Sequence, residues 1–172
     1  ASPGAELGFT LLRAEVDLRQ GRAAPAVAAL AAVPAPASRA LLLARGQAAL
    51  ALGRSDPAAA GPELQRSAEA LRSWVALQRQ DPPAWELLGQ TDDALGRPLR
   101  AMRAQAEARA AIGDLNGAID RLRAAQHLAR SGSANDFIEA SVIDARLRDL
   151  LNQRRQLAEE LRARGGRQPT PD

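Results

Sequence analysis

The sequence has 172 residues, of which 46% are hydrophobic and only 2% are aromatic, and it contains no cysteine. Its 23 basic and 20 acidic residues leave a net charge of +3. Disulfides and cysteine-based metal sites are excluded, and the scarcity of aromatic residues argues against a β-sandwich or β-barrel core. Alanine, leucine and arginine are abundant. Because these residues form helices readily, we expect an all-α fold.

The charged residues alternate in sign along the predicted helices. All the basic residues are arginine, and they are interspersed with aspartate and glutamate. This pattern is typical of a solvated helix face rather than a nucleic-acid-binding patch, so we expect no nucleic-acid partner. No apolar run approaches the ~20 residues of a membrane span, so we expect no direct membrane insertion. The chain starts at Ala1 without a secretion signal, which suggests a processed or excised fragment.

The first helix is predicted over residues 6–20, where Leu7 and Leu11 lie on one face with the α-helical period. Gly21 follows directly, as a glycine at a helix C-terminus does. Pro25 then stands where a first-turn proline belongs, which predicts a short apolar helix before the next prolines.

Ser38 is placed to cap the N-terminus of the next helix, which we expect to end at a turn containing Gly53. Residues 55–62 are rich in proline, glycine and alanine and are predicted to form a loop. A long helix is predicted over residues 63–80, and it ends where Asp81 is followed by two prolines.

Residues 85–122 contain three helical segments separated by Gly96 and Gly113, with an alanine five residues after each glycine. A large residue in one helix, a glycine at the turn and a small residue where the next helix crosses, in this order, are typical of helix–turn–helix repeats of the tetratricopeptide type. The two glycines are 17 residues apart, half of a 34-residue unit. The helix over residues 98–111 is therefore predicted to serve twice, as the second helix of one pair and the first of the next.

A loop over residues 131–135 and a long helix over residues 136–163 complete the predicted elements, and the long helix covers the last repeat. The fold class that follows is an all-α, tetratricopeptide-like α-α solenoid of about eight helices with a long C-terminal capping helix. It forms one domain over residues 1–163, and residues 164–172 are expected to be a disordered tail.

Residues that could carry chemistry are sparse. His127 is the only histidine, whereas an HExxH zinc site needs two, and a Walker A motif needs a lysine that this chain lacks. Asp92 and Asp93 are adjacent, but neighbours on a helix point about 100° apart, so they do not converge on one proton or metal. Asp93 is expected to face a groove and Asp92 a neighbouring helix. We expect no catalytic residue, cofactor or metal in this chain, and Trp74 and Trp85 are expected to pack in the core.

A binding role remains, because the first helices of tetratricopeptide pairs line a concave surface. Mixed charge on that surface suits a peptide, or an exposed strand or loop of a partner protein. The alternative is that this face packs against another domain of the same protein. Counted from the turn glycines, the groove-facing polar residues are Glu15, Arg19, Gln47, Glu86, Gln90, Asp93, Arg103 and Glu107.

Two runs in the C-terminal half carry a family resemblance: AQAEARAAIGDLNGAIDRLRAAQHLARSG and VIDARLRDLLNQRRQL. They resemble the C-terminal tetratricopeptide domain of the BepA family, periplasmic zinc metalloproteases with chaperone-like activity that help to assemble outer-membrane β-barrels. The resemblance covers residues 82–157, and Asp144–Leu147 is its more specific part because generic arrays lack this helix. The family's protease domain, with its HExxH motif, is not in this sequence, so no catalytic residue carries over and zinc is expected only in that domain.

The resemblance implies a periplasmic location and three kinds of protein partner. These are outer-membrane β-barrel clients, the barrel-assembly machinery and the parent's own protease domain. A tetratricopeptide scaffold or adaptor of another envelope assembly or secretion system is the alternative. An enzyme in its own right is a third hypothesis, which zinc-dependent proteolysis by this chain alone would support.

Overall fold

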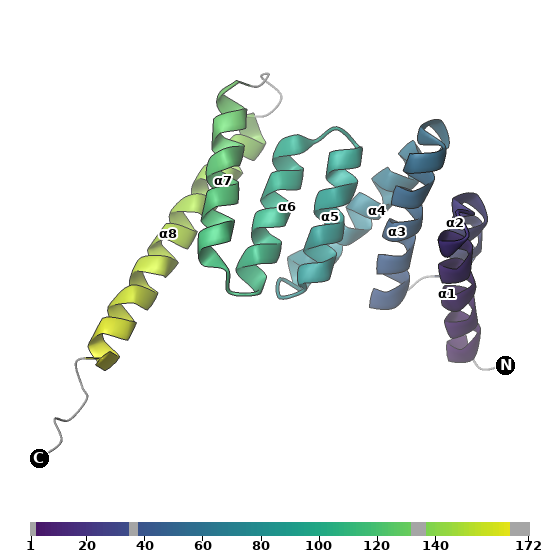
Figure 1. Ribbon diagram of the computed structural model, residues 1–172, viewed down its shortest axis with the longest axis horizontal. Helices are drawn as coiled ribbons and strands as arrows, with labels where there is room; N and C mark the ends of the chain where they lie inside the picture. Colours follow the sequence, from purple (N-terminus) through teal and green to yellow (C-terminus); the bar gives the residue numbers. More distant parts are fainter. Residues whose placement is uncertain (1–2, 35–37, 132–136, 166–172) are drawn as a thin grey trace, which may run out of the picture.

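The computed structural model describes residues 3–34, 38–131 and 137–165. Within these residues it has eight α-helices and no strand, which confirms the all-α prediction (Figure 1). The helices are α1 (Pro3–Arg19), α2 (Ala23–Ala31), α3 (Arg39–Ser55), α4 (Pro57–Leu77), α5 (Pro82–Ala94), α6 (Pro98–Ala111), α7 (Leu115–Arg130) and α8 (Phe137–Gly165).

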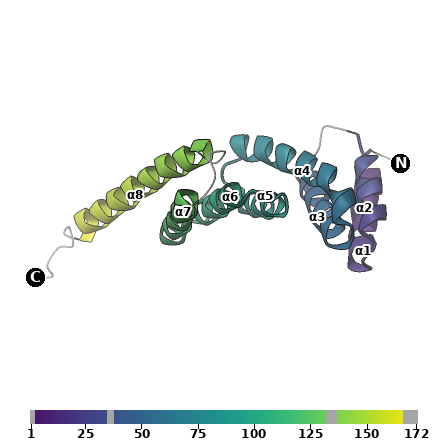
Figure 2. The same cartoon turned by 90° about the horizontal axis from the view of Figure 1, so that it is seen from above.

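Each helix packs on the next one, and the stack is solenoid-like. In addition α1 contacts α3 and α3 contacts α5, whereas α7 packs mainly on α6 and α8. Helix α6 lies between α5 and α7 in one layer, and α4 and α8 lie on the same side of that layer (Figure 2). The predicted double use of the helix over residues 98–111 is therefore confirmed.

Three of the predicted turn glycines have the expected backbone. Gly21, Gly96 and Gly113 have φ values of +74°, +70° and +83°, a left-handed conformation that glycine adopts without a Cβ clash. Gly53 does not: it lies inside α3, so the prediction of a turn there is wrong.

The predicted loop over residues 55–62 is also wrong, because α4 begins at Pro57. The Asp56 side chain accepts a hydrogen bond from the Ala59 amide and caps the helix, and Pro57 occupies the first turn, where its missing N–H costs nothing. Pro62 removes one helical hydrogen bond, but it lies on the exposed side of α4, where water can satisfy the Ala58 carbonyl.

Helix α6 contributes to two separate parts of the core through two faces. Ala104 and Ala108 pack in the cluster that contains Trp85. Leu99 and Ala106 pack in the cluster that contains Ile119, Ile143 and Leu150 from α7 and α8. Because alanine is small, α6 can lie close to both of its neighbours in the layer.

Asp81 joins three helices at the start of α5. Its carboxylate accepts hydrogen bonds from Nε and Nη2 of Arg39 in α3 at 2.7 and 2.8 Å, and from Nε1 of Trp74 in α4 at 2.9 Å. It also caps α5 by accepting from the Ala84 amide at 3.4 Å. The hydrogen bonds from Arg39 are the main reason why the pKa of Asp81 falls to about 2. Trp74 and Trp85 both pack in the same core cluster, as the sequence predicted.

Helix α8 is anchored along its first half and extends beyond α7 in its second (Figure 1). Ile143, Leu147 and Leu150 are buried, whereas Leu157 and Leu161 are exposed. The helix ends at Gly165, two residues past the predicted end at 163, and the rest of the predicted tail lies outside the described residues. No helix among the described residues is long and apolar enough to cross a bilayer.

Candidate partner-binding surfaces

Four of the predicted groove residues form an exposed row on two adjacent helices. Gln47 projects from α3, and Glu86, Gln90 and Asp93 project from α5. Helical spacing places the three α5 side chains on one stripe, about 80–140° around the helix from Trp85. None of the four side chains is hydrogen-bonded to a described residue, so all are available to a partner. We call this set the α3–α5 row.

The remaining predicted residues lie elsewhere. Glu15 and Arg19 form an exposed ion pair with each other on α1, at 2.6 Å between Oε1 and Nη2. A pair of this kind contributes little, because water screens it well. Arg103 and Glu107 of α6 are directed to α8 and are only partly exposed. The structure therefore does not bring the eight residues into one groove.

Arg103 and Glu107 help to hold α8 in place. Arg103 is hydrogen-bonded through Nε to Glu139, and Glu107 accepts from Nε and Nη2 of Arg146 at 2.7 and 2.8 Å. A paired guanidinium and carboxylate in this side-by-side geometry is one of the stronger polar contacts in proteins. The hydrogen bond to Glu107 raises the pKa of Arg146, which keeps its charge fixed.

Replacing Glu107 with alanine is expected to loosen α8 more than the rest of the molecule. The variant loses both hydrogen bonds to Arg146, and we expect the free energy of unfolding to fall by about 1–2 kcal/mol. Amide hydrogen exchange should accelerate in α8 and stay unchanged in α3. Exchange that accelerates equally in the two helices would show that the pair does not act locally.

The adjacent carboxylates of α5 have different environments, as the sequence predicted. Asp92 is buried and lies against Arg72 of α4 at 3.3 Å and Arg97 at 3.5 Å. Asp93 is exposed and belongs to the α3–α5 row. Asp92 therefore ties α4 to α5, and only Asp93 can meet a partner.

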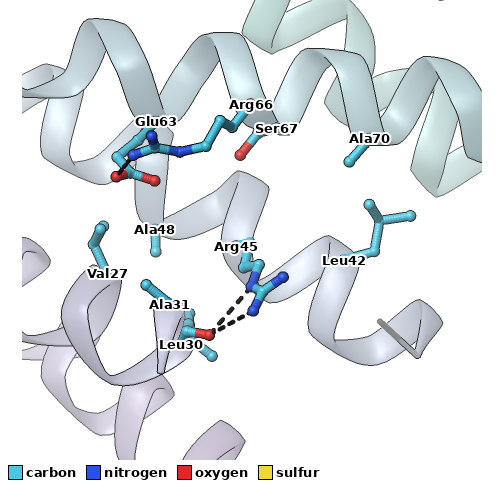
Figure 3. Close-up of a pocket in the computed structure, with 10 residues that line it drawn as sticks. All are labelled: Val27, Leu30, Ala31, Leu42, Arg45, Ala48, Glu63, Arg66, Ser67 and Ala70. Atoms are coloured by element: carbon cyan, nitrogen blue, oxygen red, sulfur yellow. Dashed lines mark hydrogen bonds and ion pairs between the residues drawn. The ribbon is translucent and has the colours of Figure 1, made fainter. Parts of the chain in front are cut away.

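A cleft of about 370 Å³ opens between α2 and α4, with α3 at its base (Figure 3). Its charged groups are already engaged: Arg45 donates to the carbonyls of Leu30 and Val33 at the end of α2, and Glu63 pairs with Arg66. The rest of its lining is largely aliphatic, from residues such as Val27. This α2–α4 cleft offers few free polar groups, so nothing in it selects a particular partner.

A second cleft, of about 550 Å³, lies between α4 and α8 with α6 beneath it. Of the eight predicted site residues, only Arg103 and Glu107 line it. The sequence prediction named no site residue on α8, which forms one wall of this cleft. The sequence signal that could have indicated this cleft is that α8 carries charges opposite in sign to those of α6, such as Arg146 opposite Glu107. The other charged groups that line this α4–α8 cleft are Arg72, Arg79, Arg146 and Asp149.

The described residues contain no group of three or more histidine, aspartate or glutamate side chains placed to hold a metal ion. His127 is exposed near the end of α7. Surfaces of the described residues that could recognise another molecule include the α3–α5 row and the two clefts. A scan against models of known protein families finds no match, and a search of curated proteins finds no similar one.

Proposed function

We propose that this chain is a protein-interaction module of the tetratricopeptide type, and that the α3–α5 row binds a segment of the partner protein. The observation that carries the proposal is the row itself. Glu86, Gln90 and Asp93 continue onto Gln47 of the adjacent helix, all exposed and none engaged within the described residues. Two stacked helices with aligned polar groups present a long, rigid surface, which suits a peptide or strand better than a small molecule.

The finer proposal is that the module belongs to a BepA-like periplasmic metalloprotease and binds outer-membrane β-barrel proteins, the barrel-assembly machinery or its own protease domain. Its support is the sequence resemblance over residues 82–157. The most specific part of that resemblance, Asp144–Leu147, includes Arg146, which pairs with Glu107, and Leu147, which is buried. The most specific part of the resemblance therefore includes residues that pack α8 against the preceding helices.

Capture of purified barrel-assembly complex by the immobilised chain tests this proposal. Reversing two charges of the α3–α5 row, Glu86→Arg with Asp93→Arg, is expected to reduce capture by about tenfold, because interface charges that lose their complement cost up to several kcal/mol. Both side chains are exposed, so the fold should be unaffected, as circular dichroism would verify.

The matched control is Glu159→Arg with Glu160→Arg, which changes the net charge equally at the far end of α8, where both side chains are exposed. This variant should capture the complex like the unchanged chain. Equal loss in the two variants would mean that net charge alone drives capture. Failure of the unchanged chain to enrich the complex would contradict the barrel-assembly partner, and an envelope or secretion adaptor would then be the better proposal.

A further inference from the structure

The α4–α8 cleft exists because α6 is shared between two helix pairs. Helices α5, α6 and α7 occupy one layer, and α4 and α8 approach each other on the opposite layer above α6 (Figure 2). Helix α6 has no large contact with α4. Its Arg103, Glu107, Ala110 and Ala111 therefore line the open space between the two outer helices. The space, about 550 Å³, falls in the size range of ligand-binding sites.

The cleft has many more hydrogen-bond donors than acceptors. Four arginines line it, and each guanidinium carries five N–H groups. Only a few of these are used: one of Arg72 by Asp92, one of Arg103 by Glu139, and two of Arg146 by Glu107.

The acceptors among the lining side chains are two carboxylates, Glu107 and Asp149, and the amide oxygens of Gln80 and Gln153. Both carboxylate oxygens of Glu107 accept from Arg146, which leaves Asp149 as the open carboxylate among the described lining residues. Arg79 is exposed, and its guanidinium has no bond to a described residue; its backbone carbonyl accepts from Nε1 of Trp85, which fixes the chain at this point. The guanidinium donors still outnumber these acceptors, so a partner that supplies acceptors can use the remaining donors.

We infer that the α4–α8 cleft binds an acidic segment of a partner protein, with its carboxylates on the guanidinium groups of Arg79, Arg72 and Arg103. Arginine suits this task, because its planar fork matches a carboxylate with two parallel hydrogen bonds. The floor at Ala110 and Ala111 carries no large side chain, so the backbone of the segment can lie close to α6.

This inference rests on the proposed function, since both treat the chain as a protein-binding module, but it concerns the opposite face of the layer. The α3–α5 row carries Glu86 and Asp93 and presents acceptors, whereas the cleft presents donors. The two surfaces can therefore be tested by separate variants.

Fluorescence anisotropy with the whole chain and a short labelled peptide of alternating glutamate and alanine tests the inference. We expect saturable binding that weakens with salt, and much weaker binding of the same peptide with glutamine in place of glutamate. Arg79→Glu should raise the dissociation constant by about tenfold, because it removes a donor and places a like charge beside the peptide. Arg79→Gln should have a smaller effect in the same direction.

Arg148→Glu is the matched control, because this exposed arginine lies on the side of α8 away from Arg146 and the cleft. It should leave the dissociation constant within about twofold. The inference is overturned if the glutamate peptide does not bind, if the glutamine peptide binds equally well, or if Arg79→Glu and Arg148→Glu have the same effect. Tighter binding of a single-stranded oligodeoxythymidine would also overturn it. The proposed function is tested separately, by how well the Glu86→Arg, Asp93→Arg variant captures the barrel-assembly complex.

Discussion

Replacing Asp81 with alanine is expected to lower the free energy of unfolding by about 2–4 kcal/mol, the largest effect of any single polar change that we predict. The variant removes the cap of α5 and the acceptor for both Arg39 and Trp74, so three helices lose a shared contact. Urea unfolding followed by circular dichroism measures the change.

Asp56→Ala separates the capping role of Asp81 from its wider network. Asp56 also caps a helix, but among the described residues its side chain accepts only from the Ala59 amide. Its replacement should cost about 1 kcal/mol, the usual cost of losing an N-cap. Equal costs for the two variants would mean that Arg39 and Trp74 add nothing to the stability that Asp81 provides.

The contribution of Asp81 should also depend on pH. Its pKa is about 2 in the folded protein against an ordinary value of 3.8, so the unfolded chain binds more protons between these values. The stabilisation is therefore complete above pH 4 and is lost as the pH falls towards 2. The difference in unfolding free energy between the unchanged chain and Asp81→Asn should shrink across this window. A difference that stays constant down to pH 2 would contradict the role of the charge.

Replacing Gly46 with valine is expected to cost about 1–3 kcal/mol, because α3 and α5 approach too closely for a side chain there. A Cβ atom on Gly46 would lie 2.6 Å from Cδ2 of Leu87, which is itself buried. Leu87→Ala should partly rescue the variant, so that the double variant loses less stability than the sum of the two single ones. Urea unfolding of the four proteins gives this coupling energy directly.

Gly53 provides the contrast within the same helix. A Cβ atom there would meet Ala60 and Leu64 at 3.7 Å, which is ordinary contact. Gly53→Ala should therefore raise the free energy of unfolding by about 0.5–1 kcal/mol, because alanine favours the helix. If Gly46→Val proved neutral, or if Leu87→Ala gave no rescue, the close approach of α3 and α5 would not limit the residue at this position.

The turns show how far local sequence predicts this fold. Gly21, Gly96 and Gly113 each stand directly before the N-cap position of the next helix, so the left-handed glycine and the helix start coincide. Gly53 lies seven residues after Gly46, as Gly96 lies seven after Gly89, but the residue that caps the next helix is Asp56, three positions after Gly53. The helix continues to that cap. Glycine alone therefore did not locate the boundary. The next residue does not separate the cases either, because Gly21, Gly53 and Gly96 are all followed by arginine.

The surroundings of the eight predicted groove residues were harder to predict, because they depend on how helices far apart in the sequence pack together. Periodicity placed Glu86, Gln90 and Asp93 correctly on one exposed stripe of α5. It could not show that Arg103 and Glu107 are directed to α8, because their partners Glu139 and Arg146 lie 36 and 39 residues away along the chain. Which side of α6 the last helix covers depends on how α5, α6 and α7 share a layer, and no local pattern encodes that arrangement.

The position of α6 also governs how the two halves of the molecule unfold. Residues of α3 to α5 reach the cluster of α7 and α8 chiefly through α6, whose Ala104 and Ala108 belong to one cluster and Leu99 and Ala106 to the other. In a linear array, stability is the sum of the stability of each repeat and of the interfaces between neighbours, and the interfaces make neighbouring repeats unfold together. Helix α6 therefore couples the unfolding of the two halves. While α6 is folded they unfold as one unit, and when α6 is disrupted they unfold as two.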